Sequence, residues 1–218
     1  MQTILCVALG YFIGQINPSY LLARRKGFDI RSRGSGNAGA SNAVVTLGIT
    51  AGIICALFDI SKSFLVVKLA FRLFPRLSAA GMIAGTACIL GHIFPLSMQF
   101  HGGKGLACLG GVVLAHNAGL FLCLLLLEVF VVFITNYLCF VPVSGSILFF
   151  AILLFTGYVT AALVFLPAMV AILYRHLENF KRILQGSEAH FSYLWDKENE
   201  TRRLEENTGI SHKKILGE

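Results

Sequence analysis

Most of the chain up to residue 173 consists of long apolar runs separated by short polar segments. The first apolar run covers residues 3–23, the second extends from about residue 43 to 73, and the third covers 78–99. A helix needs about 20 apolar residues to cross the hydrocarbon core of a bilayer. The pattern therefore predicts an all-α fold, a polytopic integral membrane helical bundle whose short loops carry the polar residues.

Two further apolar runs are longer than one membrane span. Residues 106–135 would form a straight helix of about 45 Å, whereas the hydrocarbon core is about 30 Å thick. We expect this run to break at His116-Asn117, and the similar run 143–173 to break at Gly157 or Pro167. Splitting both gives about seven spans and leaving both whole gives five. We favour seven, because five would place the loop at residues 136–146 outside, away from the other polar loops.

Basic residues follow the first apolar run directly, and they indicate its orientation. These residues are Arg24, Arg25, Lys26, Arg31 and Arg33. Because cytoplasmic loops are enriched in Lys and Arg, we expect the N-terminus outside and, with seven spans, the C-terminus inside. Arg72 and Arg76 would then lie in an external loop, against the same tendency.

The composition agrees with a membrane location and narrows the chemistry. Of 218 residues, 56% are hydrophobic and 13% charged, with a mean hydropathy of +0.74, whereas soluble domains carry about 25% charged residues. The net charge of +7 comes entirely from residues 1–173, where only Asp29, Asp59 and Glu128 are acidic. The basic residues stand singly or in short clusters, so we expect small anions and no nucleic acid as partners. So few carboxylates predict no metal and no cofactor.

Four polar clusters lie at the ends of the predicted spans, at residues 31–42, 100–105, 136–146 and 174–188. The seven-span topology places all four at the cytoplasmic edge of the membrane. Their convergence on one side predicts a single site. Within the second apolar run, Asp59 and Lys62 have the spacing to pair on one helix face.

The first cluster is rich in glycine, hydroxyl and amide groups and reads Gly34-Ser35-Gly36-Asn37-Ala38-Gly39-Ala40-Ser41-Asn42. It stands between Arg31 and an apolar helix, and the free N–H groups at a helix N-terminus attract phosphate. The cluster therefore indicates an anion-binding loop. The alternative is a flexible loop in which Ser41 or Asn42 caps the helix, and the two interpretations are compatible.

The second cluster, His101-Gly102-Gly103-Lys104-Gly105, combines three glycines with one cation. Its glycines would let the backbone approach a ligand closely. It lacks the Gly-x4-Gly-Lys-Ser/Thr pattern, so it is not a Walker nucleotide site. The alternative is a tight turn with a lysine at the lipid headgroups.

The third and fourth clusters offer hydroxyls and one histidine. Ser144 and Ser146 could contact a substrate or simply belong to a loop and cap. His176 and Asn179 share one helix face, and Arg182 follows. The histidine could donate to a phosphate, act as a base, or only occupy the interface. The H-x4-D spacing of the common glycerolipid acyltransferases and the GxSxG elbow are both absent.

Together these motifs resemble the bacterial acyl-phosphate:glycerol-3-phosphate acyltransferase family, small integral-membrane enzymes that make lysophosphatidic acid. The resemblance covers most of residues 10–188. It rests on the order and spacing of Asp29-Ile30-Arg31, the cluster Gly34 to Asn42, Asp59-Ile60-Ser61-Lys62, Gly91-His92-Ile93-Phe94-Pro95, Phe100-His101-Gly102-Gly103-Lys104-Gly105-Leu106-Ala107, His176-Leu177-Glu178-Asn179-Phe180-Lys181-Arg182 and Gly186-Ser187-Glu188.

The resemblance implies roles for individual residues. The catalytic set would be Ser35, Lys104, His176 and Asn179, with Lys104 on the substrate phosphate. The substrate-binding set would be Arg31, Gly34, Gly36, Asn37, Gly102, Gly103, Gly105, Ser146 and Arg182. Glu188 would be mainly structural. The substrate-binding serine of the family is matched to Ser146, with Ser144 as the alternative. Val45 replaces a phosphate-contacting arginine of the family, so Arg31, Arg33 or Arg182 would have to substitute.

The implied function is an enzyme of the first step of phospholipid synthesis. It would move a fatty acyl group from acyl phosphate to the sn-1 hydroxyl of glycerol-3-phosphate, giving 1-acyl-glycerol-3-phosphate (lysophosphatidic acid) and phosphate. Either His176 or the donor phosphate would take the proton. The alternative is a transporter or channel for a phosphorylated metabolite, which could use the same basic loops.

We expect a monomer in the bacterial plasma membrane, in contact with membrane lipids, with its site on the cytoplasmic side. Residues 1–188 are expected to form the acyltransferase domain, and residues 189–218 a charged cytoplasmic tail. Within this tail, Asp196–Asn207 predicts a solvated helix with internal ion pairs.

Overall fold

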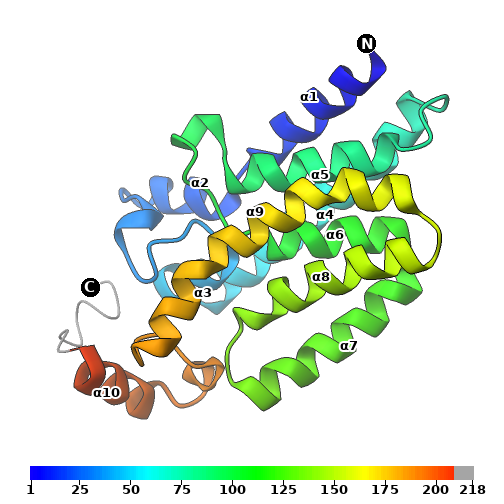
Figure 1. Cartoon of the computed structure of the whole chain (residues 1–218). Coiled ribbons are helices and arrows are strands. Elements are labelled where there is room, and N and C mark those ends of the chain that lie inside the picture. The colour runs from blue at the N-terminus through cyan, green and yellow to red at the C-terminus, as the bar shows by residue number, and fades with distance from the viewer. Residues whose placement is uncertain (209–218) are drawn as a thin grey trace.

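In the computed structural model, which describes residues 1–208, every regular element of this part of the chain is helical (Figure 1). In chain order the elements are α1 (Gln2–Gly14), α2 (Pro18–Arg25), η1 (Ile30–Ser32), α3 (Ala40–Leu47), α4 (Ile49–Leu73), α5 (Ala80–Ile93), η2 (Leu96–Met98), α6 (Leu106–His116), α7 (Ala118–Thr135), α8 (Phe140–Phe155), α9 (Val159–Leu184), η3 (Phe191–Leu194) and α10 (Lys197–Thr208). The all-α prediction is confirmed. Residues 209–218 of the predicted tail lie outside the described residues.

Four helical segments of the described chain are long and apolar enough to cross a membrane by length and composition. They are Gln2–Arg25, Ala80–Met98, Ala118–Thr135 and Val159–Leu184. The apolar helices α6 and α8 are shorter than this criterion. A multi-pass membrane fold is therefore confirmed, whereas the number of seven spans stays a prediction.

Both long apolar runs are divided as predicted, because each carries a local signal. Asn117 ends α6 and caps α7, its side chain accepting a hydrogen bond from the Leu120 N–H at 2.8 Å. Gly157 has a φ of +84°, a conformation that favours glycine, and it turns the chain from α8 into α9. The suggested break at Pro167 is wrong. This proline lies inside α9, which continues to Leu184, as helices in membranes tolerate proline.

The first apolar run is also divided into two helices, which its hydrophobic pattern did not predict. α1 ends at Gly14, and Asn17 caps α2 by accepting a hydrogen bond from the Tyr20 N–H at 2.9 Å. Pro18 occupies the first turn of α2, where its missing N–H costs nothing. This break turns α2 away from α1 (Figure 1).

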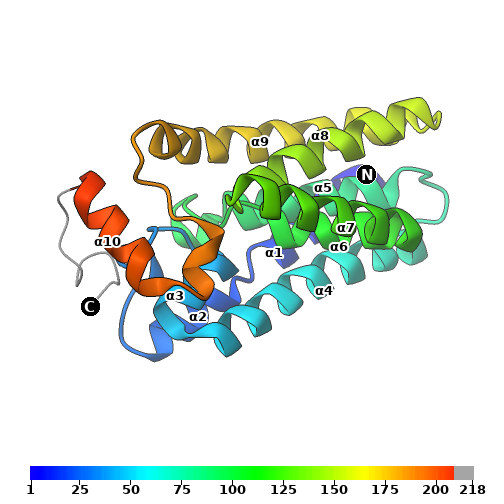
Figure 2. The ribbon, with the colours of Figure 1, turned by 90° about the horizontal axis from the view of Figure 1, so that it is seen from below.

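The helices stack in layers, as Figure 2 shows, with α8 and α9 on one side and α4 on the other. The largest buried cluster joins α5, α6, α8 and α9 through Ile89, Val112, Phe149 and Phe165, among others. Glycine brings α1 against α5, because a Cβ on Gly10 would lie 2.1 Å from the Ala84 carbonyl oxygen. Such close approach is a common way for helices to pack in membranes.

The polar loops, α2, α3 and α10 gather at one end of the molecule, while Met1 and the turn between α8 and α9 lie at the other (Figure 1). The four polar clusters thus lie toward the same end, as predicted, whereas their forming a single site stays a prediction. The third cluster is less of a loop than expected. α8 already begins at Phe140, so Ser144 and Ser146 lie on a helix.

A buried polar group ties the middle of α4 to its neighbours. Lys62 Nζ lies 2.6 Å from Asp59 Oδ1, which confirms the predicted pair, and it donates to the Gly14 and Ile16 carbonyl oxygens at 3.0 and 2.6 Å. Donor atoms of Asp59, His92 and Cys108 lie within 4.8 Å of one another. The Lys62 ammonium already supplies a cation beside the Asp59 carboxylate. An unpaired buried charge would cost much free energy, so this pairing satisfies both groups and cross-links the helices.

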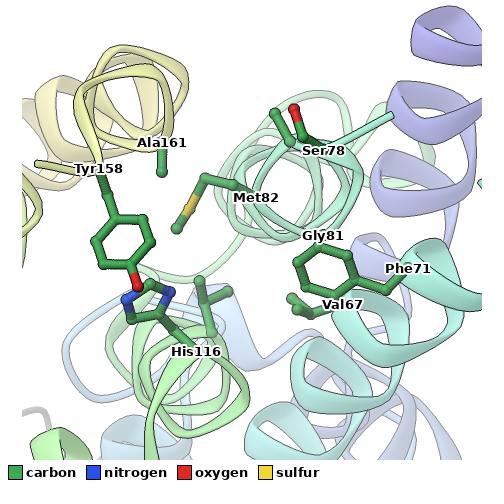
Figure 3. A pocket seen from close by; sticks show the side chains of 10 residues that line it. Val67, Phe71, Ser78, Gly81, Met82, His116, Tyr158 and Ala161 are labelled. Carbon is green, nitrogen blue, oxygen red and sulfur yellow. The ribbon is translucent and has the colours of Figure 1, made fainter. Parts of the chain in front are cut away.

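A cavity of about 150 Å³ lies where α5 and α9 begin and α6 ends. Figure 3 shows the side chains that line it. The ring of Tyr158 stands edge-on to that of His116, with centroids 5.4 Å apart. The rest of its lining is mostly apolar, including Val67, Phe71 and Met82. The polar clusters take no part in this cavity.

Candidate functional site

The loop between α2 and α3 is fixed by an arginine that ties it to η2, the short helix just before the second polar cluster. Arg31 Nη2 donates to Asp29 Oδ2 at 2.7 Å, and Nη1 donates to the Met98 carbonyl oxygen at 2.8 Å. Hydrogen bonding from this guanidinium holds the pKa of Asp29 below its usual value. Arg31 was predicted to contact substrate, and the structure shows most of its donors engaged within the protein.

Asn42 shapes the glycine-rich loop from beneath. Its side chain is 1% exposed, and Nδ2 donates to the carbonyl oxygens of Ile30, Arg33 and Asn37 at 3.0, 3.1 and 2.8 Å. Its Oδ1 accepts from the Ser35 N–H at 3.0 Å. One buried amide thus satisfies four backbone groups of the loop, which fixes the loop's path.

The backbone conformation of this loop requires glycine at two positions. Gly34 and Gly36 have φ of +56° and +71°, which L-residues rarely adopt. A Cβ on Gly34 would lie 2.2 Å from Asn42 Oδ1. α3 starts at Ala40, after Gly39 as N-cap, so the suggested capping by Ser41 or Asn42 is wrong. Ser35 is exposed at this part of the loop.

The second loop packs tightly on the end of α5. The N–H groups of Gly102 and Gly103 donate to the carbonyl oxygens of Ile93 and His92 at 3.1 and 3.0 Å. A Cβ on Gly103 would lie 2.0 Å from His92 Nε2. These two glycines therefore allow close approach to α5, where a ligand had been expected. Gly105, with a φ of +90°, then starts α6.

Lys104 of this loop meets the end of α9 through a chain of hydrogen bonds. Lys104 Nζ donates to Asn179 Oδ1. Asn179 Nδ2 donates to Glu188 Oε1 at 2.5 Å, and Glu188 Oε2 accepts from Arg182 Nε at 2.7 Å. The predicted residues Lys104, Asn179 and Arg182 are thus brought together by Glu188, in keeping with its expected structural role.

Lys104 makes no direct ion pair with a carboxylate among the described residues, since its hydrogen-bond partner is a neutral amide. Burial lowers the pKa of its ammonium from 10.5 to about 8; Arg182 and Arg175 also lower the pKa, and Glu188 and Glu178 raise it. Arg175 Nη2 donates to the Gly102 carbonyl oxygen at 3.4 Å, and its buried Nε has no hydrogen-bond partner among the described residues. Two cations therefore flank this loop with unused capacity for an anion.

His176 is held in one orientation by its own helix. The side chain is 3% exposed, and Nδ1 lies 2.7 Å from the Ile172 carbonyl oxygen. A carbonyl oxygen only accepts, so Nδ1 carries a proton in this contact. In the neutral ring, Nε2 then has the lone pair and can accept a proton.

The serines of α8 lie apart from these contacts. Ser146 is fully buried, and its hydroxyl donates to the Val143 carbonyl oxygen at 3.1 Å within the helix. Ser144 donates to Glu128 Oε2 of α7 at 2.7 Å. No hydrogen bond in the described chain links either hydroxyl to Lys104, Asn179 or His176.

Two residues make contacts that the sequence pattern did not predict. Asn42 was included in a motif, but its burial beneath the loop was not anticipated. Arg175 was not assigned a role, although it directly precedes His176 on α9 and contacts Gly102 of the second cluster. A basic residue beside a candidate catalytic histidine is a signal that could have drawn attention to it.

The chain is similar to a family of known proteins. The chain matches the family model described as glycerol-3-phosphate acyltransferase over residues 4–186. The glycerol-3-phosphate acyltransferase of Thermotoga petrophila is 39% identical over 83% of this chain and 92% of its own length. That of Bacillus subtilis (strain 168) is 36% identical over 89% of this chain and 100% of its own.

A solved structure agrees in fold. The crystal structure of PlsY (YgiH), an integral membrane glycerol 3-phosphate acyltransferase, in its glycerol 3-phosphate form, superposes with a TM-score of 0.81 at 32% identity. The match covers 89% of this chain and 98% of that one. The lysophosphatidic acid form of PlsY gives a TM-score of 0.78 at 31% identity. The chain therefore belongs to the family of integral membrane glycerol-3-phosphate acyltransferases.

Proposed function

We propose that this chain transfers a fatty acyl group from acyl phosphate to the sn-1 hydroxyl of glycerol-3-phosphate, the first step of phospholipid synthesis. The products are lysophosphatidic acid and phosphate. The relatives are named for glycerol-3-phosphate, and PlsY has a glycerol 3-phosphate and a lysophosphatidic acid form. The observation that carries the proposal is the ammonium of Lys104, which has an amide and no carboxylate as its partner.

The phosphate of glycerol-3-phosphate binds between Lys104 and Arg175. Both side chains adjoin the Gly102 loop, and cationic donors form strong hydrogen bonds to phosphate. Arg175 takes the place of the family arginine that is lost at Val45. Arg31 and Arg182 suit this task less well, because carboxylates of Asp29 and Glu188 already hold them.

The glycine-rich loop contributes side chains. Its backbone N–H at Ser35 is already bound to Asn42, whereas the Ser35 hydroxyl is exposed, has no hydrogen-bond partner among the described residues, and can donate to a phosphate oxygen. Asn37 lies in the same loop, and its buried Oδ1 has no hydrogen-bond partner among the described residues. We assign Ser35 and Asn37 to substrate contacts beside the reacting groups.

His176 is the base in this scheme. Its Nε2 takes the proton of the sn-1 hydroxyl as the hydroxyl oxygen attacks the acyl carbonyl carbon. The bond from that carbon to the phosphate oxygen breaks with its electron pair going to the phosphate. His176 then gives the proton to the leaving phosphate, which restores the neutral ring. Acyl phosphate is already activated, so the protein needs mainly to position two anions and screen their repulsion.

An open apolar groove between α5 and α9 suits the acyl chain. It has a volume of about 570 Å³ and is lined by Leu90, Phe94, Leu166, Pro167, Val170, Ala171 and Tyr174. Tyr174 directly precedes Arg175, so one end of the groove adjoins the proposed phosphate site. Apolar walls leading to a few polar groups are typical of small-molecule sites.

The same proposal includes the orientation in the membrane. The basic residues Arg24, Arg25 and Lys26 lie at the end of α2, at the polar end of the molecule, and Met1 lies at the opposite end (Figure 1). Lys- and Arg-rich loops face the cytoplasm. The site and C-terminus then face the cytoplasm of a bacterial cell, the N-terminus lies outside, and the protein acts as a monomer in the plasma membrane.

The experiment that tests this site compares Lys104→Met with Lys68→Met. Loss of a charged hydrogen bond to phosphate raises KM for glycerol-3-phosphate about 10- to 150-fold. Lys68 donates to the Ala115 carbonyl oxygen at 2.9 Å, away from the polar loops, so its variant keeps the wild-type KM. Full activity of Lys104→Met at low glycerol-3-phosphate would show that the phosphate binds elsewhere.

A further inference from the structure

The segment after Glu188 folds back onto the end of α9. The family match ends at residue 186, and the segment holds η3 and α10 beyond it. α10 has the expected position and its expected ion pairs, such as Arg203 with Glu200. It is not simply solvated, however, because Glu200, Thr201 and Leu204 are buried. One face of α10 is therefore packed against the protein.

Arg203 makes the bonds that hold this face in place. Its Nη1 donates to the Gly186 carbonyl oxygen at 2.9 Å, and Nη2 donates to the Glu188 carbonyl oxygen at 2.7 Å. Glu200 Oε1 lies 2.6 Å from the same Nη2. Asn207 Nδ2 also donates to the Gly186 carbonyl oxygen, at 2.9 Å. These bonds fix the backbone on both sides of Ser187.

Glu200 extends the contact toward the loop between α7 and α8. Its Oε1 accepts from the His190 N–H at 2.7 Å, and its Oε2 lies 3.0 Å from His190 Nδ1. His190 Nε2 in turn lies 3.1 Å from the Tyr137 hydroxyl, and the Phe191 N–H donates to the Asn136 carbonyl oxygen at 2.7 Å. The segment is thus attached both to the end of α9 and to the loop between α7 and α8.

The backbone that Arg203 holds belongs to Glu188, whose side chain leads to the proposed phosphate site. Glu188 Oε1 accepts from Asn179, and Asn179 accepts from Lys104. The bonds therefore run without a gap from Arg203 through Glu188 and Asn179 to the Lys104 ammonium. Each member limits the orientation of the next, as in other preorganised sites.

We propose that residues 189–208 form a clamp, and that Arg203 is a positioning residue that fixes Glu188 and thereby the ammonium of Lys104. The clamp touches no substrate. The inference rests on the proposed function in one respect, namely that Lys104 binds the phosphate of glycerol-3-phosphate.

The test compares Arg203→Ala with Arg202→Ala in the full chain. Arg202 is the neighbouring residue of the same helix, and its side chain is 64% exposed. Its one ion-pair partner among the described residues is Glu198, at 3.7 Å. We expect Arg203→Ala to raise KM for glycerol-3-phosphate about fivefold, the effect of one lost hydrogen bond, with kcat changed less than about twofold. Arg202→Ala keeps the wild-type KM. Arg203→Lys, which retains a donor, recovers part of the loss.

Fluorescence shows whether the segment has moved. Trp195 is the only tryptophan of the chain, and its ring packs against Phe191 with centroids 5.4 Å apart. A red-shifted emission of Arg203→Ala together with a raised KM supports the clamp. An unchanged KM, whatever the emission, overturns it, and so does an equal rise in Arg202→Ala. Should Arg203→Ala fail to fold, Glu200→Gln is measured against the same control and the same outcomes apply.

Failure of the clamp and failure of the proposed function are distinguishable. If Lys104→Met raises KM for glycerol-3-phosphate and Arg203→Ala does not, only the clamp is wrong. If Lys104→Met leaves KM unchanged, the phosphate site is wrong, and the clamp as proposed is overturned with it.

Discussion

The charge of Lys104 makes the affinity for glycerol-3-phosphate depend on pH. Burial lowers the pKa of its ammonium to about 8. Below this pH the ammonium is charged and attracts the phosphate, whereas above it the charge is lost. Because the folded-state pKa is lowered and the charged form binds substrate, KM is expected to rise as pH increases through about 8.

The size of the rise follows from the titration and from the strength of the lost bond. If only the charged form binds, KM doubles at the pKa and then rises about tenfold for each further pH unit. The rise in KM levels off at high pH, where binding to the protein with a neutral Lys104 amine takes over. A hydrogen bond to a charged group contributes about 1.5 to 3 kcal/mol, so the total rise is about 10- to 150-fold.

The assay is the initial rate against glycerol-3-phosphate concentration, from one pH unit below this pKa to about two units above it. Lys104→Arg is the matched control, because its guanidinium stays charged and its KM should remain flat. Glu188→Gln removes a charge that raises the pKa of Lys104, so its KM should begin to rise at lower pH. An equal rise in wild type and Lys104→Arg, or a flat wild-type profile, would refute the assignment.

Three further predictions concern packing, the groove and the missing arginine. Gly103→Ala should destabilise the protein by about 1 to 3 kcal/mol in thermal unfolding, since its Cβ would overlap a neighbouring ring at 2.0 Å; Gly110→Ala, with nothing nearer than 3.5 Å, should not. Val170→Trp should raise KM for a long-chain acyl donor and leave KM for glycerol-3-phosphate unchanged, whereas Leu163→Trp, on the same helix outside the groove, should change neither. Val45→Arg should lower KM for glycerol-3-phosphate at saturating donor, and an unchanged KM would show that this side chain cannot reach the phosphate.

The helix pattern was predictable where a local signal marks it. The breaks at Asn117 and Gly157 rest on a capping side chain and a left-handed glycine, both of which act within a few residues. Pro167 carries an equally strong local signal and proved wrong, because packing and the membrane overrode it. The break before Pro18 was missed, because the apolar run continues through it.

The candidate site was predictable as a set of residues but not as a set of contacts. The motifs placed Lys104 and Asn179 in it, but their hydrogen bond joins positions 75 residues apart. Arg175 became visible only through the Gly102 carbonyl, 73 residues away. Such partners depend on how helices pack, which no local pattern encodes.

The buried face of α10 shows the same limit. Its charged composition predicts a solvated helix, and the ion pairs within it follow from spacing. The partners of Arg203 are backbone carbonyl oxygens at positions 186 and 188. Every residue has a backbone carbonyl group, so the sequence pattern could not predict which ones Arg203 contacts.

The central claim is tested most directly by the choice of acyl donor. Purified wild-type protein in lipid vesicles is given labelled glycerol-3-phosphate with palmitoyl phosphate, palmitoyl-CoA or palmitoyl-acyl carrier protein, and the formation of lysophosphatidic acid is measured. We predict turnover with palmitoyl phosphate, release of one phosphate per product, and no turnover with the two thioesters. Lysophosphatidic acid formed from a thioester but not from palmitoyl phosphate would contradict the proposed reaction, and so would product formed without any donor.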